Sequence, residues 1–382
     1  MQFIYDLGPR TVAITAQFLA QYLPTWAVEL ILMILTVTSI AVFVLLTFMF
    51  LTYLERKIVA RIQDRIGPNR VGPLGLMQPV ADAVKMMTKE DITPTAAHRA
   101  AYNAAPILIV VPPLMAFAVV PFGRGMIATD LNIGILYAIA ISSLGTIALL
   151  MAGWSSSNKY SLIGAMRAVA QMVSYEVPMV LAVVGILMIT GSLSMGAIVD
   201  AQKVPFFILQ PVAFIIYLIS AIAELNRTPF DIPEAESEII AGYHTEYSGM
   251  KFGLFMMGEY VSAIAVAAIG TTVFLGGWRG PILPSYIWFL LKIYAIIFLL
   301  MWLRGTLPRL RVDQLQGFAW KFCVPVTLLN IFVTGFAAYF TRSPQTHPLV
   351  LVATYAMANV ILVGLILLLY RRPTARLAAA NR

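Results

Sequence analysis

Nine long apolar windows constrain the fold of this chain more than any other feature of its sequence. Each window holds the roughly 20 residues that a helix needs to cross the hydrocarbon core of a bilayer. The windows cover residues 29–54, 101–121, 131–153, 165–190, 205–225, 252–275, 284–303, 320–340 and 349–370. The mean hydropathy of +0.84 agrees, since soluble chains are far less apolar. The sequence therefore predicts an all-α, polytopic integral membrane protein with about nine transmembrane helices.

The polar connections between the windows are too short for a separate soluble domain. The longest, residues 55–100, is also too amphipathic for a catalytic domain of ordinary size. Residues 1–27 lack a basic start and a convincing cleavage site, so we expect a retained segment along the outer surface instead of a signal peptide. We therefore predict one transmembrane helical domain over residues 1–382.

Lysines and arginines are concentrated in the odd-numbered connections and in the C-terminal tail. Each even-numbered connection has one cation, and these are Arg124, Lys203, Arg279 and Arg342. Because basic connections stay on the cytoplasmic side, we expect the N-terminus outside the cell membrane and the odd connections and tail inside. The net charge of +8 reflects this asymmetry and some attraction to anionic lipid, not nucleic-acid binding.

One acidic cluster runs against the apolar composition of the chain. Six of its eighteen acidic residues lie between positions 224 and 246, and they are Glu224, Asp231, Glu234, Glu236, Glu238 and Glu246. Arg227 is the only cation among them. Carboxylates crowded beside lipid tend toward raised pKa values, which suit groups that exchange protons near neutral pH. Proton handling is therefore the first functional hypothesis.

Further acids fall inside the predicted helices. Glu176, Glu224 and Glu259 lie on three consecutive windows at comparable depths, and together they indicate a polar path through the membrane. We expect Lys292, in the seventh window, to be their cationic counterpart. A buried pair of Arg167 and Glu176 that only orders the helix bundle is the structural alternative.

Two short amphipathic helices are predicted between the first and second windows. The first, over residues 56–66, has isoleucines at every fourth position and is typical of a helix lying in the headgroup layer. Glu55 precedes it, where an anion gains nothing from anionic headgroups. The second lies within residues 74–91 and carries Asp82 and Lys85 one turn apart, either as a surface pair or in a functional role.

Cysteine and histidine usage excludes several kinds of bound cofactor. A single cysteine, Cys323, rules out an iron–sulfur cluster held by this chain alone. Three scattered histidines give no metal-ligand spacing, and the chain has no phosphate-binding loop and no nucleophile motif. We therefore expect no catalytic residue, metal or cofactor on this chain. If electrons are involved, another subunit carries them.

Four segments resemble signature sequences of the family of NADH-quinone oxidoreductase H subunits, which belong to the membrane arm of respiratory complex I. They read YLERKIVARIQDRIGPNRVGPLGLMQPVADAVKMMTKED, WSSSNKYSLIGAMRAVAQMVSYEVPM, AELNRTPFDIPEAESEIIAGYHTEYSGMKF and RGTLPRLRVDQL. The resemblance runs from about residue 28 to 340. The window at 349–370 departs from it, since many members of the family stop after eight spans.

The resemblance implies a lipid-soluble quinone as substrate, bound in a chamber that two peripheral-arm subunits complete. One of these partners would carry the terminal iron–sulfur cluster, small membrane-arm subunits would adjoin the chain, and the chain would have no activity alone. The residues implied at the chamber are Glu55, Arg56, Arg65, Arg227, Phe230, Asp231, Glu234, Glu236 and Glu238. The residues implied in coupling to proton translocation are Asp82, Glu176, Glu224 and Glu259. Arg304 and Arg309 match family arginines near the cytoplasmic junction, with a structural role equally open.

Two other functions fit parts of the sequence. A related complex, such as a membrane-bound hydrogenase, would use a similar membrane protein, but the RTPFDIPEAESE segment favours the quinone-linked branch. An autonomous ion or solute transporter could use the same buried acids, although the chain shows no convincing inverted repeat.

Overall fold

The computed structural model describes residues 7–232, 240–341 and 348–370. Within these ranges every regular element is a helix, and eight helical stretches are long and apolar enough to cross a membrane. They are α3 (Thr25–Ile62), α5 (Arg99–Ala116), α6 with α7 (Gly134–Ser142 and Leu144–Ser155), α8 (Lys159–Thr190), α13 (Gly249–Phe274), α14 (Ser285–Thr306), α15 through α16 (Val312–Phe318 and Val324–Phe340) and α17 (Pro348–Tyr370). The predicted all-α, polytopic membrane fold is confirmed.

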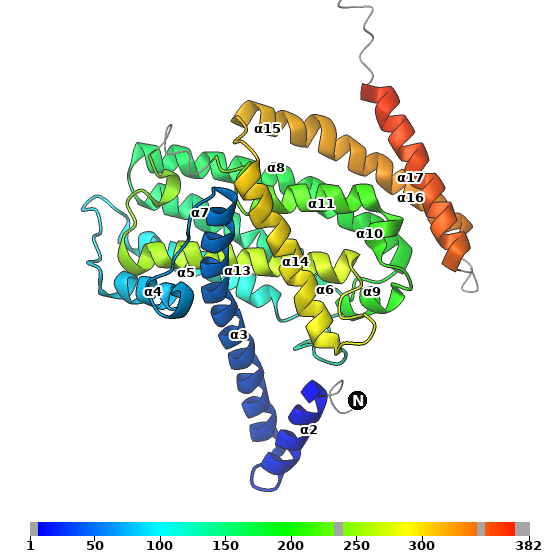
Figure 1. The fold of residues 1–382 in the computed structure, drawn as a ribbon. Helices are drawn as coiled ribbons and strands as arrows, with labels where there is room; N and C mark the ends of the chain where they lie inside the picture. Colours follow the sequence, from blue (N-terminus) through cyan, green and yellow to red (C-terminus); the bar gives the residue numbers. More distant parts are fainter. Residues whose placement is uncertain (1–6, 233–239, 342–347, 371–382) are drawn as a thin grey trace, which may run out of the picture.

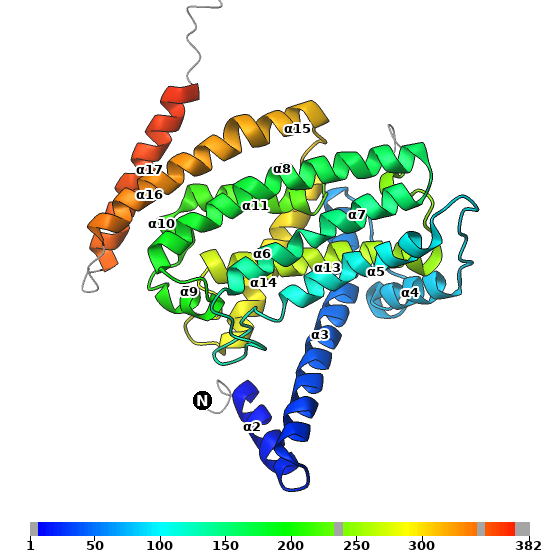
Figure 2. The same ribbon diagram turned by 180° about the vertical axis from the view of Figure 1, so that it is seen from behind.

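The helices form a bundle with two flanking additions. In Figures 1 and 2, α5, α7, α8 and α13 run side by side through the body, and α3 and α14 cross them steeply. Helix α2 (Leu7–Ala20) folds back beside the start of α3, away from the body. At the opposite edge, α17 lies along α16. Short elements complete the described chain: η1 (Pro73–Gly75), α4 (Gln78–Thr88), α9 (Met195–Ala201), α10 (Phe206–Leu209), α11 (Pro211–Glu224), η2 (Gly242–His244) and the π-helical turn η3 (Ala319–Cys323).

The window predicted over residues 205–225 is not one continuous helix. It divides at Gln210, whose backbone dihedrals of −135° and 64° separate α10 from α11. Pro211 favours this break, because a proline lacks the N–H that a continuing helix would use. The Gln210 side chain is buried, donates to the Thr334 hydroxyl at 2.7 Å and accepts from the Asn330 amide at 3.3 Å. The span predicted over residues 205–225 is therefore a short, interrupted helix whose break is hydrogen-bonded inside the bundle.

The prediction of a separate interfacial helix over residues 56–66 was wrong. Helix α3 continues without interruption to Ile62, and at 38 residues it is roughly 57 Å long. An apolar repeat of four residues fits the end of a long helix as well as it fits a separate one, so the pattern could not distinguish them. The second amphipathic helix, predicted within residues 74–91, is confirmed as α4.

Helix α17 is attached to the break by one asparagine. The Asn359 side-chain amide donates to the carbonyl of Leu209 at 2.7 Å and to the carbonyl of Tyr355 in its own helix at 2.8 Å. Tyr355 is buried beside it. The contact joins α17 to the end of α10, where the helix is interrupted before α11.

We expect Asn359→Leu to lower the stability of the purified subunit or complex by about 1 kcal/mol, the usual worth of a hydrogen bond between membrane helices. The measurement is the thermal midpoint in detergent. Met357→Leu changes an exposed side chain of the same helix and serves as the control. Equal midpoints for Asn359→Leu and the control would show that the contact contributes nothing.

Candidate functional site

A buried ion cluster joins three parts of the fold. Glu55, near the end of α3, is 4% exposed. Arg227, which follows α11, donates from Nη1 to Glu55 Oε2 at 2.7 Å, and Arg304 of α14 donates to Glu55 Oε1. A buried carboxylate is tolerable only when such partners compensate for its lost hydration. This cluster therefore fixes the end of α3 against α14 and against the loop after α11.

Arg227 is itself nearly inaccessible, at 8% exposed, and its guanidinium lies 4.3 Å from the centre of the Tyr260 ring. Burial acts to lower the pKa of Arg227, but the neighbouring Glu55 carboxylate outweighs it and raises this pKa above its usual value. The guanidinium therefore stays charged, and it is held by an ion pair on one side and by a cation–π contact on the other.

The loop over residues 225–232 is held from α8 by Gln171. The buried amide of Gln171 donates to the carbonyl of Ala223 at 2.8 Å and to the carbonyl of Phe230 at 2.7 Å. The Phe230 ring packs edge-on against Tyr175 of the same helix, with centroids 5.3 Å apart. These contacts close the loop into a compact turn next to the ion cluster.

A second set of contacts ties this loop to the segment after α14. Arg309 donates to an Asp231 carboxylate oxygen at 3.1 Å, and the Leu310 backbone N–H donates to the carbonyl of Pro229, also at 3.1 Å. The structure therefore brings together six of the residues that the sequence singled out. They are Glu55, Arg227, Phe230, Asp231, Arg304 and Arg309.

Arg56 and Arg65, which were also implied at the chamber, lie outside this cluster. Arg56 is exposed and donates to Asp82 of α4 at 2.6 Å, with Lys85 at 3.9 Å from the same carboxylate. Arg65 is exposed too, and it donates to Gln63 at 2.8 Å. Arg56 and Arg65 line one open hollow at the surface and do not join the buried cluster. The predicted residues Glu234, Glu236 and Glu238 lie outside the described residues.

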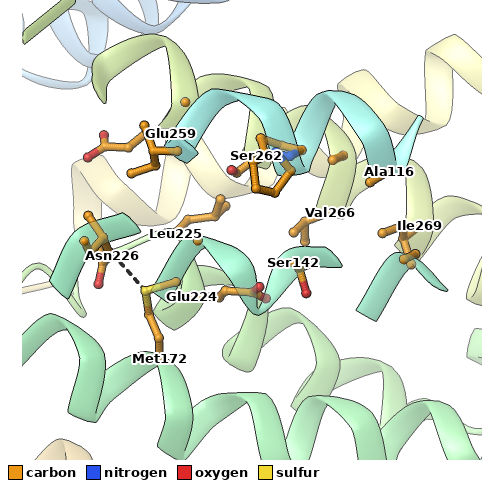
Figure 3. Close-up of a pocket in the computed structure, with 18 of the residues that line it drawn as sticks. Ala116, Ser142, Met172, Glu224, Leu225, Asn226, Glu259, Ser262, Val266 and Ile269 are labelled. Carbon is orange, nitrogen blue, oxygen red and sulfur yellow. Dashed lines mark hydrogen bonds between the residues drawn. The ribbon is translucent and has the colours of Figure 1, made fainter. Parts of the chain in front are cut away.

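An internal cavity of about 70 Å³ lies between α5, α6, α11 and α13 (Figure 3). Its wall is mostly apolar, but six polar residues face it: Ser142, Glu224, Asn226, Tyr243, Glu259 and Ser262. A space of this size holds roughly two to five waters, and the six polar residues offer them hydrogen-bond partners. The cavity therefore has two of the three predicted intramembrane carboxylates in its wall.

The two carboxylates differ in their surroundings. One Glu224 oxygen is buried and has no hydrogen-bond partner among the described residues, and Figure 3 places Ser142 nearby. Glu259 accepts a hydrogen bond from the Tyr243 hydroxyl at 3.1 Å. Glu176 of α8 does not line the cavity but interacts electrostatically with Glu224. Glu224 therefore shares the cavity with Glu259 and interacts with Glu176, and a polar path through the three acids stays a prediction.

The predicted role of Lys292 as their cationic counterpart was wrong. Its ammonium group donates to three backbone carbonyls, those of Leu275 at 2.7 Å, Gly277 at 2.9 Å and Arg279 at 2.7 Å. These carbonyls follow the end of α13, whereas Glu259 lies in the first half of that helix. The lysine therefore holds the turn that follows α13, by donating to three of its backbone carbonyls.

Sequence reasoning missed three residues of the site: Gln171, Tyr243 and Tyr260. Gln171 carried a usable signal, because a glutamine in an apolar window requires a partner. The two tyrosines carried none, since tyrosine is common in membrane helices and loops. No group of three or more histidine, cysteine or acidic side chains in the described part of the chain is arranged to hold a metal ion.

Comparison with known proteins identifies the family. The sequence model described as NADH dehydrogenase matches residues 3–335, so the matched region ends before α17. The NADH-quinone oxidoreductase H subunit of Dehalococcoides mccartyi strain CBDB1 is 52% identical over 320 residues, which cover 84% of this chain and 91% of the relative. The corresponding protein of Carboxydothermus hydrogenoformans is 51% identical over 328 residues, or 85% and 94% of the two chains. That of Brevibacillus brevis is 49% identical over 324 residues, or 83% and 96%. This chain therefore belongs to the family of NADH-quinone oxidoreductase H subunits and is a multi-pass membrane subunit of complex I.

Proposed function

We propose that this subunit forms much of a quinone-binding chamber and couples quinone reduction to proton translocation through its buried carboxylates. The chamber would lie at the end of α3, around Glu55, Arg227, Phe230 and Asp231, with Arg56 and Arg65 at its rim. Quinone would be the substrate, and electrons would come from an iron–sulfur cluster on a neighbouring peripheral-arm subunit. The other complex I subunits would complete the site.

The orientation follows from the same assignment. The ends of α3, α11 and α14 meet at the ion cluster, and the connections on that side carry most of the lysines and arginines. We infer that this side faces the cytoplasm, in agreement with the positive-inside rule. The peripheral-arm partners would then dock over the loop after α11 and over the surface that includes Arg56 and Asp82.

The observation that carries the coupling proposal is the short path between the two polar sites. Only Leu225 and Asn226 separate Glu224, at the cavity, from Arg227, in the ion cluster. Reduction of a quinone to a quinol takes up two protons, so negative charge develops beside the chamber before they arrive. That charge would compete with Glu55 for Arg227, and any displacement of Arg227 would reach Glu224 through two residues.

The proton path would begin at the cavity. Glu224 and Glu259 face the same polar space, and Glu176 lies within electrostatic reach of Glu224. Because nearby carboxylates repel one another when both are ionised, a proton gained by one changes the proton affinity of the next. Asp82 of α4 is paired with Arg56, so a change of charge in the chamber would act on Asp82 through Arg56.

We expect Glu224→Gln to lower proton pumping by the assembled complex at least about twofold, because the amide cannot exchange a proton. Electron flow from NADH to an artificial acceptor upstream of the quinone should be unchanged, which shows that the complex has assembled. Glu90→Gln neutralises an exposed carboxyl after α4 and is the matched control. Unchanged pumping and quinone reduction in both Glu224→Gln and Glu176→Gln would refute the coupling proposal.

A further inference from the structure

We propose that Tyr243 is a positioning residue that holds the Glu259 carboxylate and links its proton exchange to the position of the loop after the acidic segment. The inference rests on the proposed function, because Glu259 matters to turnover only if the cavity handles protons. It adds a residue whose action is indirect, since Tyr243 acts on Glu259 and not on the quinone.

The geometry aims the Tyr243 hydroxyl at the Glu259 carboxylate. Tyr243 is 1% exposed, lines the cavity and donates to Glu259 Oε1 at 3.1 Å. Its ring packs against Phe255 of α13, with centroids 5.4 Å apart and planes inclined at 63°. The ring is therefore fixed on the same helix that carries Glu259, one turn before it.

The backbone of this segment is anchored to α8. The Ser161 hydroxyl donates to the Tyr243 carbonyl at 2.9 Å. The neighbouring Gly242 lies so close to Gly164 of α8 that a methyl group at Gly164 would come within 2.6 Å of the Gly242 Cα. This close approach allows the chain to pass between α8 and α13 and to present Tyr243 to the cavity.

The residues after Tyr243 are also fixed. The Tyr102 hydroxyl donates to the Glu246 carbonyl at 2.7 Å, and the Asn158 amide donates to the Glu246 carboxylate at 2.6 Å. In the sequence, only three residues separate Tyr243 from the acidic segment at 233–239. A movement of the acidic segment would therefore displace Tyr243. The hydrogen bonds at Glu246 would hold the residues that follow in place.

A phenol suits a carboxylate that gains and loses a proton. When Glu259 is ionised, the hydroxyl donates to it and stabilises the charge. When Glu259 is protonated, the same hydroxyl can rotate and accept the new O–H. Tyr243 can therefore remain hydrogen-bonded to Glu259 in both states. Any movement of the Tyr243 ring would change the free-energy difference between the ionised and the protonated carboxyl.

The other ionisable groups near Glu259 in the described part of the chain set the background for this effect. Glu224 lines the same cavity, and Arg227 interacts with Glu259 electrostatically. His244 adjoins Tyr243, and burial lowers the pKa of this histidine to about 4, so it adds no charge at neutral pH. The lining contributed by α5 is apolar, through Ile109, Pro112, Pro113 and Ala116. Loss of the Tyr243 hydroxyl would therefore change the proton exchange of Glu259 itself.

The test is the pH profile of proton pumping by the assembled complex. Tyr243→Phe should move the acidic limb of the profile upward by roughly one pH unit, because a carboxylate that loses a hydrogen-bond donor holds its proton more tightly. Tyr247→Phe is the matched control. It removes a hydroxyl from the same segment, but one that faces Ser155 and the Tyr102 carbonyl. The control should leave the limb unchanged.

Two further variants separate positioning from general disruption. In a Glu259→Gln background, Tyr243→Phe should cause no additional shift, because residue 259 can no longer ionise. Difluorotyrosine at position 243 keeps the ring and makes the hydroxyl a stronger donor, so it should move the limb downward. This variant tests the proposal even if Tyr243→Phe prevents assembly.

The possible results distinguish this inference from the proposed function. If Glu259→Gln impairs pumping but neither replacement at position 243 moves the limb, the role of Tyr243 is refuted and the proposed function stands. An additional shift in the Glu259→Gln background would also refute it. If Glu224→Gln and Glu259→Gln both leave pumping unchanged, the proposed function fails and the inference fails with it.

Discussion

Replacing Glu55 with glutamine is expected to lower quinone reduction by the assembled complex at least about tenfold and to destabilise the subunit by about 3–5 kcal/mol. Glutamine keeps the shape of the side chain but leaves Arg227 and Arg304 facing a neutral amide. Arg227 is nearly inaccessible to solvent, so hydration cannot replace the lost ion pair. The measurements are the NADH:quinone reductase rate and the thermal midpoint of the purified complex.

Glu29→Gln is the control on the same helix, because Glu29 is exposed near the opposite end of α3. It should change neither quantity. The effect of Glu55→Gln should also be non-additive with Arg227→Met, since removing both partners of a buried pair costs less than the sum of the single changes. Full additivity, or an unaltered quinone reductase rate in Glu55→Gln, would show that the cluster does not organise the site.

The sequence predicted the membrane helices well, because bilayer thickness imposes a length that apolar windows reveal directly. It failed at the end of α3 and at the α10–α11 break. Pro205 and Pro211 were visible signals of the break, but the window was long enough to conceal it. Whether a proline bends or ends a helix depends on partners for the freed backbone groups. Here the Leu209 carbonyl accepts from Asn359 of α17, and the Gln210 side chain donates to Thr334 of α16, both far along the chain.

The members of the site were easier to predict than their pairing. Glu55, Arg227 and Arg304 were each conspicuous as charges beside apolar windows, yet positions 55 and 304 are separated by most of the chain. Lys292 was assigned to the acids because depth along a helix can be counted, whereas the packing partner at that depth cannot. Tyr243 was missed for the same reason. Its contact with Glu259 depends on the turn that brings the two side chains together.

Acidification is expected to destabilise the complex through His244. Burial lowers the pKa of His244 from its ordinary value of 6.5 to about 4. Above pH 6.5 the histidine is neutral in both the folded and the unfolded chain, so it contributes no pH dependence. Between pH 6.5 and pH 4 only the unfolded chain binds the proton, and the free energy of unfolding falls as the pH is lowered. The loss is about 1 kcal/mol at pH 5.5 and about 3 kcal/mol at pH 4.

His244→Phe should remove this part of the acid sensitivity. The ring of residue 244 packs beside Tyr243 and Phe252, and its Nδ1 is buried with no hydrogen-bond partner among the described residues, so phenylalanine fits the surroundings. The quantity to compare is the difference between thermal midpoints at about pH 7.5 and about pH 5.5, because the replacement can raise both midpoints. His98→Phe alters a more accessible histidine and should leave the difference as it is in the unaltered complex. If His244→Phe also leaves it unchanged, the buried histidine is not the group that takes up the proton on unfolding.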